Sequence, residues 1–184
     1  MKVRTILSLA ARLADREDVA SFLKGTTYEA DSERELDKFL DCYRIVEQDI
    51  AVNYLALTKR EIAEAENGTV SLSSLSRAVV NVLRVESERG EGLRYRLFPD
   101  RIETRRGKCA IVYTYLPEDK NPEDDCELLR QIPPAVIAYG VVCEYYTMNG
   151  LYDEAATFDK KYKDGLIASC AVSPKRRMEA RKWL

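Results

Sequence analysis

Residues 36–57 limit the possible folds most strongly, because their apolar side chains recur every three or four positions for about seven helical turns. This face contains Leu36, Phe39, Leu40, Tyr43, Val46, Ile50, Tyr54 and Leu57. A cap signal precedes it, in which Asp31 or Ser32 is followed by Glu35 and can satisfy the free N–H groups of a helix start. The pattern predicts one amphipathic helix of roughly 35 to 40 Å at 1.5 Å per residue.

A shorter amphipathic helix is predicted at the beginning of the chain. Its apolar face consists of Val3, Ile6, Leu7, Ala10, Leu13 and Ala14. Charged residues recur through this segment, and no apolar core with a cleavage site follows, so it is not expected to be a targeting signal. No stretch of about 18 apolar residues occurs in the sequence, so we expect no membrane span.

The hydrophobic period changes between residues 58 and 116. Segments 79–87, 92–98, 100–104 and 108–117 are rich in β-branched and aromatic residues and are separated by glycine or proline, which favours short antiparallel strands. Asn67-Gly68 suits a two-residue hairpin turn, which we prefer to an extension of the preceding helix through residues 62–66. In the last strand Cys109, Ile111, Tyr113 and Tyr115 alternate with Ala110, Val112 and Thr114. This alternation predicts one buried face.

The helical period returns after the acidic linker that starts at Pro117. Pro122 followed by Glu123, Asp124 and Asp125 is typical of a helix start, because the acidic side chains favour the positive end of the helix dipole. Residues 135–148 are apolar almost all round and predict a buried central helix. Its predicted antiparallel partner, residues 151–169, has Leu151, Ala155, Phe158, Tyr162 and Leu166 on one face.

The expected fold is therefore α+β and mainly α. A single helical-bundle domain, residues 1–172, would contain an inserted small antiparallel β-sheet at about residues 58–116. An extended C-terminal arm, residues 173–184, would follow.

The composition argues against an enzyme, because the 184 residues include no histidine, the residue most often used for proton transfer near neutral pH. The cysteines are odd in number, widely spread and without a CxxC pair: Cys42, Cys109, Cys126, Cys143 and Cys170. Neither a zinc site nor a disulfide framework is suggested. We expect no catalytic, cofactor-binding or metal-binding residues.

Several charged or polar groups have two interpretations. Glu144 could be a buried carboxylate with a raised pKa, or it could pair with an arginine of the bundle or of a subunit contact. The predicted sheet is basic through Arg94, Arg96, Arg101, Arg105, Arg106 and Lys108. Tyr95 and Phe98 lie among these residues, as in a nucleic-acid surface, but interspersed glutamates favour a solvated or subunit-facing sheet. Serines 71, 73, 74 and 76 would suggest a nucleophile only beside a base.

The C-terminal segment contains the only tryptophan of the chain. The candidate partner-binding residues are Arg176, Arg177, Met178, Arg181, Lys182, Trp183 and Leu184. Leaving the Trp-Leu end in water would expose roughly 200 Å² of side-chain surface and forfeit several kcal/mol at about 25 cal/mol per Å². The segment is therefore expected to dock on its own core or on another chain, and we prefer another chain.

Four stretches occur in order along the chain: LDCYRIVEQDIAVNYLAL (40–57), IVYTYLP (111–117), AYGVVCEYYTMNGLYDEAATFDKKYKDGL (138–166) and RKWL (181–184). Together they resemble the head-to-tail adaptor, or connector, proteins of tailed bacteriophages and prophages of Gram-positive bacteria. The sequence departs from that pattern at residues 55–57, where relatives often have a proline that ends the long helix.

The resemblance implies a virion structural protein made in the host bacterial cytoplasm and located in the virion neck. Twelve copies would form a ring beneath the portal, contact a tail or stopper protein, and let DNA pass without sequence-specific binding. Residues 181–184 would anchor the arm on the portal, whereas Tyr139, Gly140, Glu144, Tyr145 and Ala155 would be structural. The alternative function is a cytosolic interaction or nucleic-acid-binding module that uses the basic sheet and the C-terminal segment.

Overall fold

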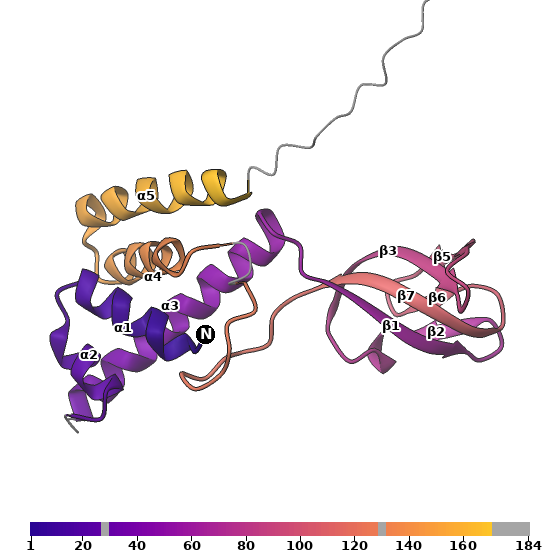
Figure 1. The fold of residues 1–184 in the computed structure, drawn as a ribbon, viewed down its shortest axis with the longest axis horizontal. Coiled ribbons are helices and arrows are strands. Elements are labelled where there is room, and N and C mark those ends of the chain that lie inside the picture. Colours follow the sequence, from indigo (N-terminus) through magenta and orange to yellow (C-terminus); the bar gives the residue numbers. More distant parts are fainter. Residues whose placement is uncertain (27–29, 129–131, 171–184) are drawn as a thin grey trace, which may run out of the picture.

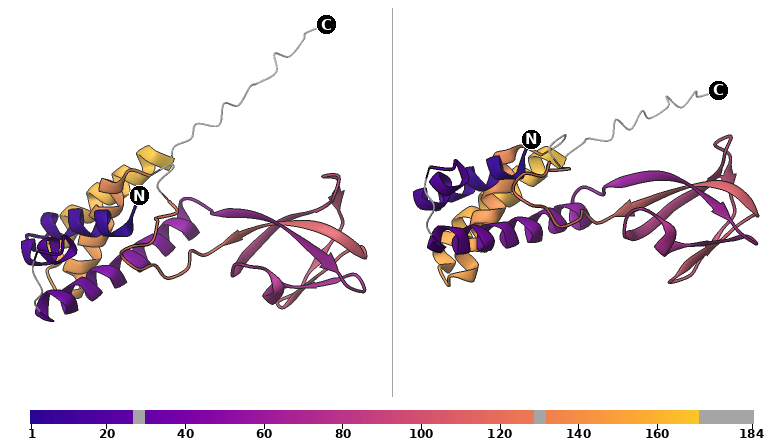
Figure 2. Two further views of the ribbon diagram at one scale, coloured as in Figure 1. Left: turned by 60° about the horizontal axis from the view of Figure 1, so that its bottom comes forward. Right: turned by 90° about the horizontal axis from the view of Figure 1, so that it is seen from below.

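The computed structural model describes residues 1–26, 30–128 and 132–170. The molecule is elongated and has two lobes, a helical bundle and a β-insert that projects from one end of it (Figure 1). The views in Figure 2 show the same separation from two further sides. The predicted class, α+β and mainly α with an inserted antiparallel sheet, is confirmed.

The bundle is built from helices whose apolar faces converge on one core. Within the described residues these are α1 (Val3–Leu13), α2 (Glu17–Leu23), α3 (Ala30–Asn53), α4 (Pro134–Met148) and α5 (Tyr152–Cys170). The predicted long helix is α3, whose 24 residues span about 36 Å. It ends at Asn53, so Leu57 lies beyond the helix, but Leu57 still packs against the bundle core.

Helix α4 lies at the centre of the bundle, as its all-round apolarity predicts, and α3 and α5 both contact it. Two glycines allow this close packing. A Cβ atom on Gly140 would lie 2.9 Å from both Tyr162 and Val46, and one on Gly165 would lie 2.7 Å from Val136. Since real Cβ atoms are not found that close to other heavy atoms, both positions require glycine or a shift of the neighbouring helix.

The β-insert consists of two small sheets. Its strands are β1 (Thr58–Ala65), β2 (Thr69–Ser71), β3 (Val79–Ser87), β4 (Gly92–Leu93), β5 (Arg96–Leu97), β6 (Arg101–Glu103) and β7 (Gly107–Tyr115), with a 3-10 turn η1 (Leu72–Ser74). The strand orders are β1-β7-β3-β4 and β2-β6-β5. The predicted hairpin is confirmed, because Asn67 and Gly68 join β1 to β2 with φ values of 52° and 83°, as a type I′ turn requires.

The prediction that one face of β7 is buried against a core is confirmed, but its other face is covered too, so that residues 109–113 are all buried. One face packs into the insert core through Cys109, Ile111 and Tyr113. The other face carries Ala110 and Val112, whose neighbours in register on β1 and β3 include Arg60, Arg84 and Glu86. These long side chains join in ion pairs across the strand and cover the two small apolar residues.

The predicted helix start at Pro122 is also wrong. Residues 122–125 instead form turns that pair with the beginning of α1, where the N–H groups of Val3 and Arg4 donate to the carbonyls of Asp124 and Pro122 at 2.9 and 2.8 Å. These are first-turn N–H groups that a helix cannot satisfy internally. The linker therefore caps α1, and its acidic side chains meet Lys2 and Arg4 rather than a helix dipole of their own.

Candidate interaction surfaces

The predicted partner-binding residues, Arg176, Arg177, Met178, Arg181, Lys182, Trp183 and Leu184, lie outside the described residues. The structure describes the helix that leads to them, because α5 runs to Cys170. The inner face of α5 is buried through Ala155, Tyr162 and Leu166. Leu151, which was predicted to lie on the same face, is exposed. In Figures 1 and 2 the last turn of α5 lies beside the end of α3, at the side of the bundle that faces the β-insert.

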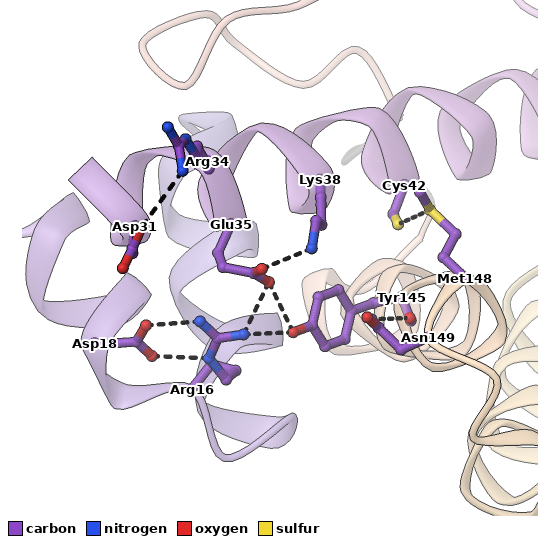
Figure 3. Close-up of polar contacts among 10 residues, drawn as sticks. All are labelled: Arg16, Asp18, Asp31, Arg34, Glu35, Lys38, Cys42, Tyr145, Met148 and Asn149. Carbon is purple, nitrogen blue, oxygen red and sulfur yellow. Dashed lines mark hydrogen bonds and ion pairs between the residues drawn. The ribbon is translucent and has the colours of Figure 1, made fainter. Parts of the chain in front are cut away.

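A polar network joins three helices at the opposite end of the bundle (Figure 3). Arg16, between α1 and α2, contacts Asp18 at 2.8 Å, Glu35 of α3 at 2.8 Å and the hydroxyl oxygen of Tyr145 of α4 at 2.6 Å. The Tyr145 hydroxyl donates to Glu35 at 2.9 Å. The hydrogen bond with Asp18 raises the pKa of Arg16, against the opposing effect of burial. Each group therefore has a partner, and the network fixes helix positions rather than presenting a reactive group.

An acidic seam, defined by Asp49 of α3, Glu144 of α4 and Asp159 of α5, occupies one face of the bundle. The hydroxyl group of Tyr162 donates to Asp49 at 2.9 Å, and Asp159 pairs with Lys163 at 2.7 Å. Glu144 has no hydrogen bond or ion pair with any residue that the structure describes. Burial raises the pKa of Glu144, and the charges of Asp49 and Asp159 raise it further.

Glu144 therefore matches the first interpretation of the sequence, a partly buried carboxylate with a raised pKa. A pairing arginine is not found among the described bundle residues.

Exposed apolar side chains adjoin the acidic seam. Ile45 and Val52 of α3 are 49% and 57% exposed, and Met148 of α4 is 56% exposed. Ile45 and Val52 are two turns apart on one side of α3, and Asp49 lies between them in sequence. The sulfur of Met148 lies 3.4 Å from that of Cys42, also on α3, and the charge of Glu144 acts on Cys42. Apolar and acidic groups thus form one continuous surface, the seam face.

The distal end of the β-insert is basic. Exposed cationic side chains there include Arg89, Arg94, Arg96, Arg105, Arg106 and Lys108. None of these six forms an ion pair or a side-chain hydrogen bond with any residue the structure describes. Arg101 differs, because it pairs with Asp100 and Glu103 and stacks on Phe98 at 4.5 Å. A shallow hollow of about 680 Å³ between Arg94, Tyr95, Arg96 and Glu103 belongs to this basic end.

One of the four serines has a lysine neighbour. The hydroxyl group of Ser76 contacts the ammonium group of Lys59 and donates to Glu61 at 2.6 Å. Tyr113 donates to the same carboxylate at 2.8 Å, and Lys59 forms an ion pair with it. This lysine is therefore occupied by its contacts with Glu61 and Ser76. Glu144 lies in the other lobe, so an active site that combines Glu144 with these serines is excluded by their positions.

The neck, residues 54–57 and 116–128, joins the two lobes and contains a buried lysine, Lys120, beside a partly buried glutamate, Glu127. Glu127 accepts hydrogen bonds from Tyr115 at 2.9 Å and Lys120 at 2.5 Å. Burial alone would raise the pKa of Glu127, but these hydrogen bonds hold it below its usual range. The network connects the last residue of β7 to the linker.

Glu47 of α3 faces the neck from the bundle and is 1% exposed. Burial raises its pKa to about 6, against the opposing hydrogen bond from Tyr43 and the charge of Lys120. Its position could have been inferred, because Glu47 follows Tyr43 by four residues and thus falls on the apolar face of the predicted helix.

Comparisons with protein-family models and with curated proteins find no match for this chain. Among the residues that the structure describes, no group of histidine, cysteine and acidic side chains is placed to hold a metal ion. No helix in the described ranges is long and apolar enough to cross a membrane. The surfaces described above are therefore the basis for inferring a function.

Proposed function

We propose that this chain is a structural protein of a phage virion, a head–tail connector adaptor that forms a ring under the portal. The observation that carries the proposal is the basic, tryptophan-ended segment that follows α5, a helix whose inner face is buried in the bundle. A buried aromatic side chain with basic neighbours is typical of a binding hot spot. The resemblance of residues 40–57, 111–117, 138–166 and 181–184 to connector proteins supports the same function.

The two-lobed shape suits an assembly subunit, because each lobe offers a different free surface to its neighbours. At the proposed head–tail junction of the virion, twelve copies of the chain form the ring. They contact one another, the portal and a tail or stopper protein. DNA passes through the channel without sequence-specific binding. Repetition around a ring turns a weak arm contact into a tight one, since every further arm binds at high effective concentration.

Deletion of residues 173–184 tests the arm. We expect binding to the portal protein of the same phage or prophage to be lost, while the circular-dichroism melt of the helices stays within a few degrees, because the described core residues of both lobes are all retained in the variant. Trp183→Ala should weaken binding at least about tenfold. Glu179→Ala, in the same segment, is the matched control and should retain binding. A deletion variant that still binds the portal would contradict the proposed function.

The basic end of the β-insert favours a second candidate function, binding to nucleic acid. Arg94 and Arg96 are exposed, have no ion pair within the described residues and flank Tyr95, and arginines beside an aromatic ring are typical of single-strand binding. Gel shifts at two salt concentrations test it, because phosphate contacts weaken steeply with salt. Replacing Arg94 and Arg96 by alanine should abolish the shift, whereas Arg101→Ala, which removes a paired arginine, should not.

A further inference from the structure

Glu144 is a carboxylate that lacks a counter-charge. It is partly buried on α4 and has no hydrogen bond or ion pair within the described ranges. The charged groups that act on Glu144 and raise its pKa are Asp49 and Asp159, which are also acidic. Lys163 lies on the same face but pairs with Asp159 at 2.7 Å. A cationic occupant of the seam face would supply the missing counter-charge and lower the repulsion among the three carboxylates.

The same face also favours an apolar occupant. Ile45, Val52 and Met148 are each about half exposed, although most other apolar residues of α3 and α4 are buried in the core or packed against it. Covering such side chains stabilises a complex by about 25 cal/mol per Å² of apolar surface removed from water. The seam face thus calls for a partner with both cationic and large apolar side chains.

One segment of this chain has that chemistry. Residues 173–184 contain Lys175, Arg176, Arg177, Arg181 and Lys182 against a single glutamate, and they contain Met178, Trp183 and Leu184. The segment follows α5, whose last turn lies beside the end of α3 (Figures 1 and 2). Residues 171–184 can extend to at most about 50 Å, which exceeds the roughly 36 Å length of α3. Trp183 can therefore reach any part of the seam face of its own molecule.

We propose that, before assembly, the seam face binds residues 173–184 of the same chain. The apolar side chains of the arm, Met178, Trp183 and Leu184, together cover Ile45, Val52 and Met148, and the basic residues face Asp49 and Glu144. The docked arm is unavailable to other partners and must leave the seam face to bind elsewhere. Its release by the portal rests on the proposed function, whereas the intramolecular contact does not.

The fluorescence of Trp183 tests the contact directly in the full-length chain, because no other tryptophan is present. A synthetic peptide of residues 171–184 provides the reference for a solvated tryptophan. We expect the population of molecules with a docked arm to exceed that of molecules with a free arm about tenfold. The emission maximum should then lie at a shorter wavelength than that of the peptide, and acrylamide quenching should be severalfold weaker.

Two variants of the seam face identify the binding surface. Glu144→Lys reverses the charge that faces the arm and can pair with Asp49 and Asp159, so the fold is retained while the arm is repelled. Val52→Ser removes half-exposed apolar surface. Both should return the emission and the quenching to the values of the peptide. Leu83→Ser is the matched control, since Leu83 is 47% exposed but lies in the β-insert, and it should leave the fluorescence unchanged.

Three outcomes would overturn the proposal. A wild-type emission equal to that of the peptide means that Trp183 is not docked. A shifted emission that neither seam variant changes places the tryptophan on another surface. A shift that disappears on dilution means that the occupant is the arm of a second copy. The portal-binding assay is independent of all three, so an adaptor whose arm does not contact the seam face is recognised by portal binding combined with a peptide-like emission.

Discussion

The two lobes differ in how they are stabilised and in what they present to solvent. The bundle packs the described helices α1 to α5 around large, fully buried side chains, including Phe39 and Tyr43. The β-insert has a smaller core around Ile102, Ile111 and Tyr113. The free surface of the bundle combines acidic and apolar groups, whereas the far end of the insert carries arginines that form no ion pair with any residue that the structure describes. The comparison indicates that the bundle is the more rigid part of the molecule and that the insert is an exposed module attached to it.

Exposed apolar residues also arise differently in the two lobes. In the bundle, Ile45 and Val52 are exposed because they lie on the side of α3 that none of the other described helices covers. In the insert, Val80 and Leu83 are exposed at two irregularities of β3, where the register with β7 skips one residue each time. Bulges of this kind redirect side chains and interrupt pairing. The β3 surface is therefore less able than a regular strand to pair with another sheet.

Core truncations should separate the lobes most clearly. Phe39 is fully buried and stacks on Tyr145, with the ring centroids 4.2 Å apart. The substitution Phe39→Ala should therefore lower the free energy of unfolding by about 3–5 kcal/mol. Ile102→Ala should cost about 2–5 kcal/mol in the insert. Amide hydrogen exchange should show faster exchange in α4 for the first variant and in β7 for the second. Equal acceleration of both elements by both variants would mean that the lobes unfold as one unit.

Glycine substitutions sharpen the contrast between tight and open packing. Gly165→Val would place a branched side chain against Val136, where even a Cβ atom would be 2.7 Å away, and should destabilise the bundle by up to about 3 kcal/mol. Gly92→Val is the same change in β4, where a Cβ atom would meet nothing within 4 Å. Its effect should stay within about 0.5 kcal/mol. Denaturant unfolding measures both, and similar losses would refute the packing difference.

The pH dependence of the unfolding free energy should reveal the ionisation of Glu47, which is buried at the boundary between the lobes and has a pKa of about 6. In the unfolded chain this carboxyl ionises near pH 4.3. Between these values the native state holds a proton that the unfolded state has released, so stability falls as pH rises, by about 2 kcal/mol in total. Glu47→Gln should remove this fall. The difference between wild-type and variant unfolding free energies, measured from pH 4 to pH 7, should therefore change across that window.

Other charged groups face Glu47, and the comparison with the variant separates their effects. Lys120 and Glu127 approach it from the linker, and Tyr43 and Cys126 adjoin it in the core. Glu127 has a lowered pKa, so its contribution is lost as pH falls and has the opposite sign. Because Glu127 is present in both proteins, its effect largely cancels in the difference. A difference that stays constant with pH would show that Glu47 is ionised throughout.

Periodicity predicted the elements whose environment is uniform along their length. The face of α3 through Leu36, Phe39 and Tyr43, the buried α4 and the hairpin at Asn67-Gly68 could all be predicted because local sequence determines them. The structure of the linker could not be predicted in this way. Pro122 and the acidic residues after it have the composition of a helix start, but the first N–H groups of α1, 118 or more residues away in sequence, compete for the same carbonyls. Only tertiary structure shows which pairing wins.

The candidate site shows the same limit. The chemistry of the arm was evident from residues 173–184, whereas the seam face was not, because its carboxylates come from α3, α4 and α5 and are far apart in sequence. Glu144 was recognised as unusual within an apolar helix. Its relation to Asp49 and Asp159 depends on the way α4 packs between α3 and α5, which Gly140 and Gly165 permit. Sequence reasoning thus singled out the residues of the proposed arm but not the surface that we propose as its complement.

The smallest predicted effect concerns the ion pairs that cover the outer face of the four-stranded sheet. Glu86 has a 13% exposed side chain and pairs with Arg84 at 2.6 Å and with Arg60 at 3.3 Å. Either arginine can compensate for the other, so Arg84→Ala and Arg60→Ala should each cost less than about 0.5 kcal/mol. Removing both leaves the carboxylate without a cation, so the double variant should lose more than the sum, with a coupling of about 0.5–1 kcal/mol. A double-mutant cycle from denaturant unfolding of the insert measures this coupling. If the losses of unfolding free energy in the two single variants simply add up in the double variant, solvent already screens the Glu86 carboxylate. The ion-paired face of the four-stranded sheet would then be as accessible to solvent as the basic end of the insert.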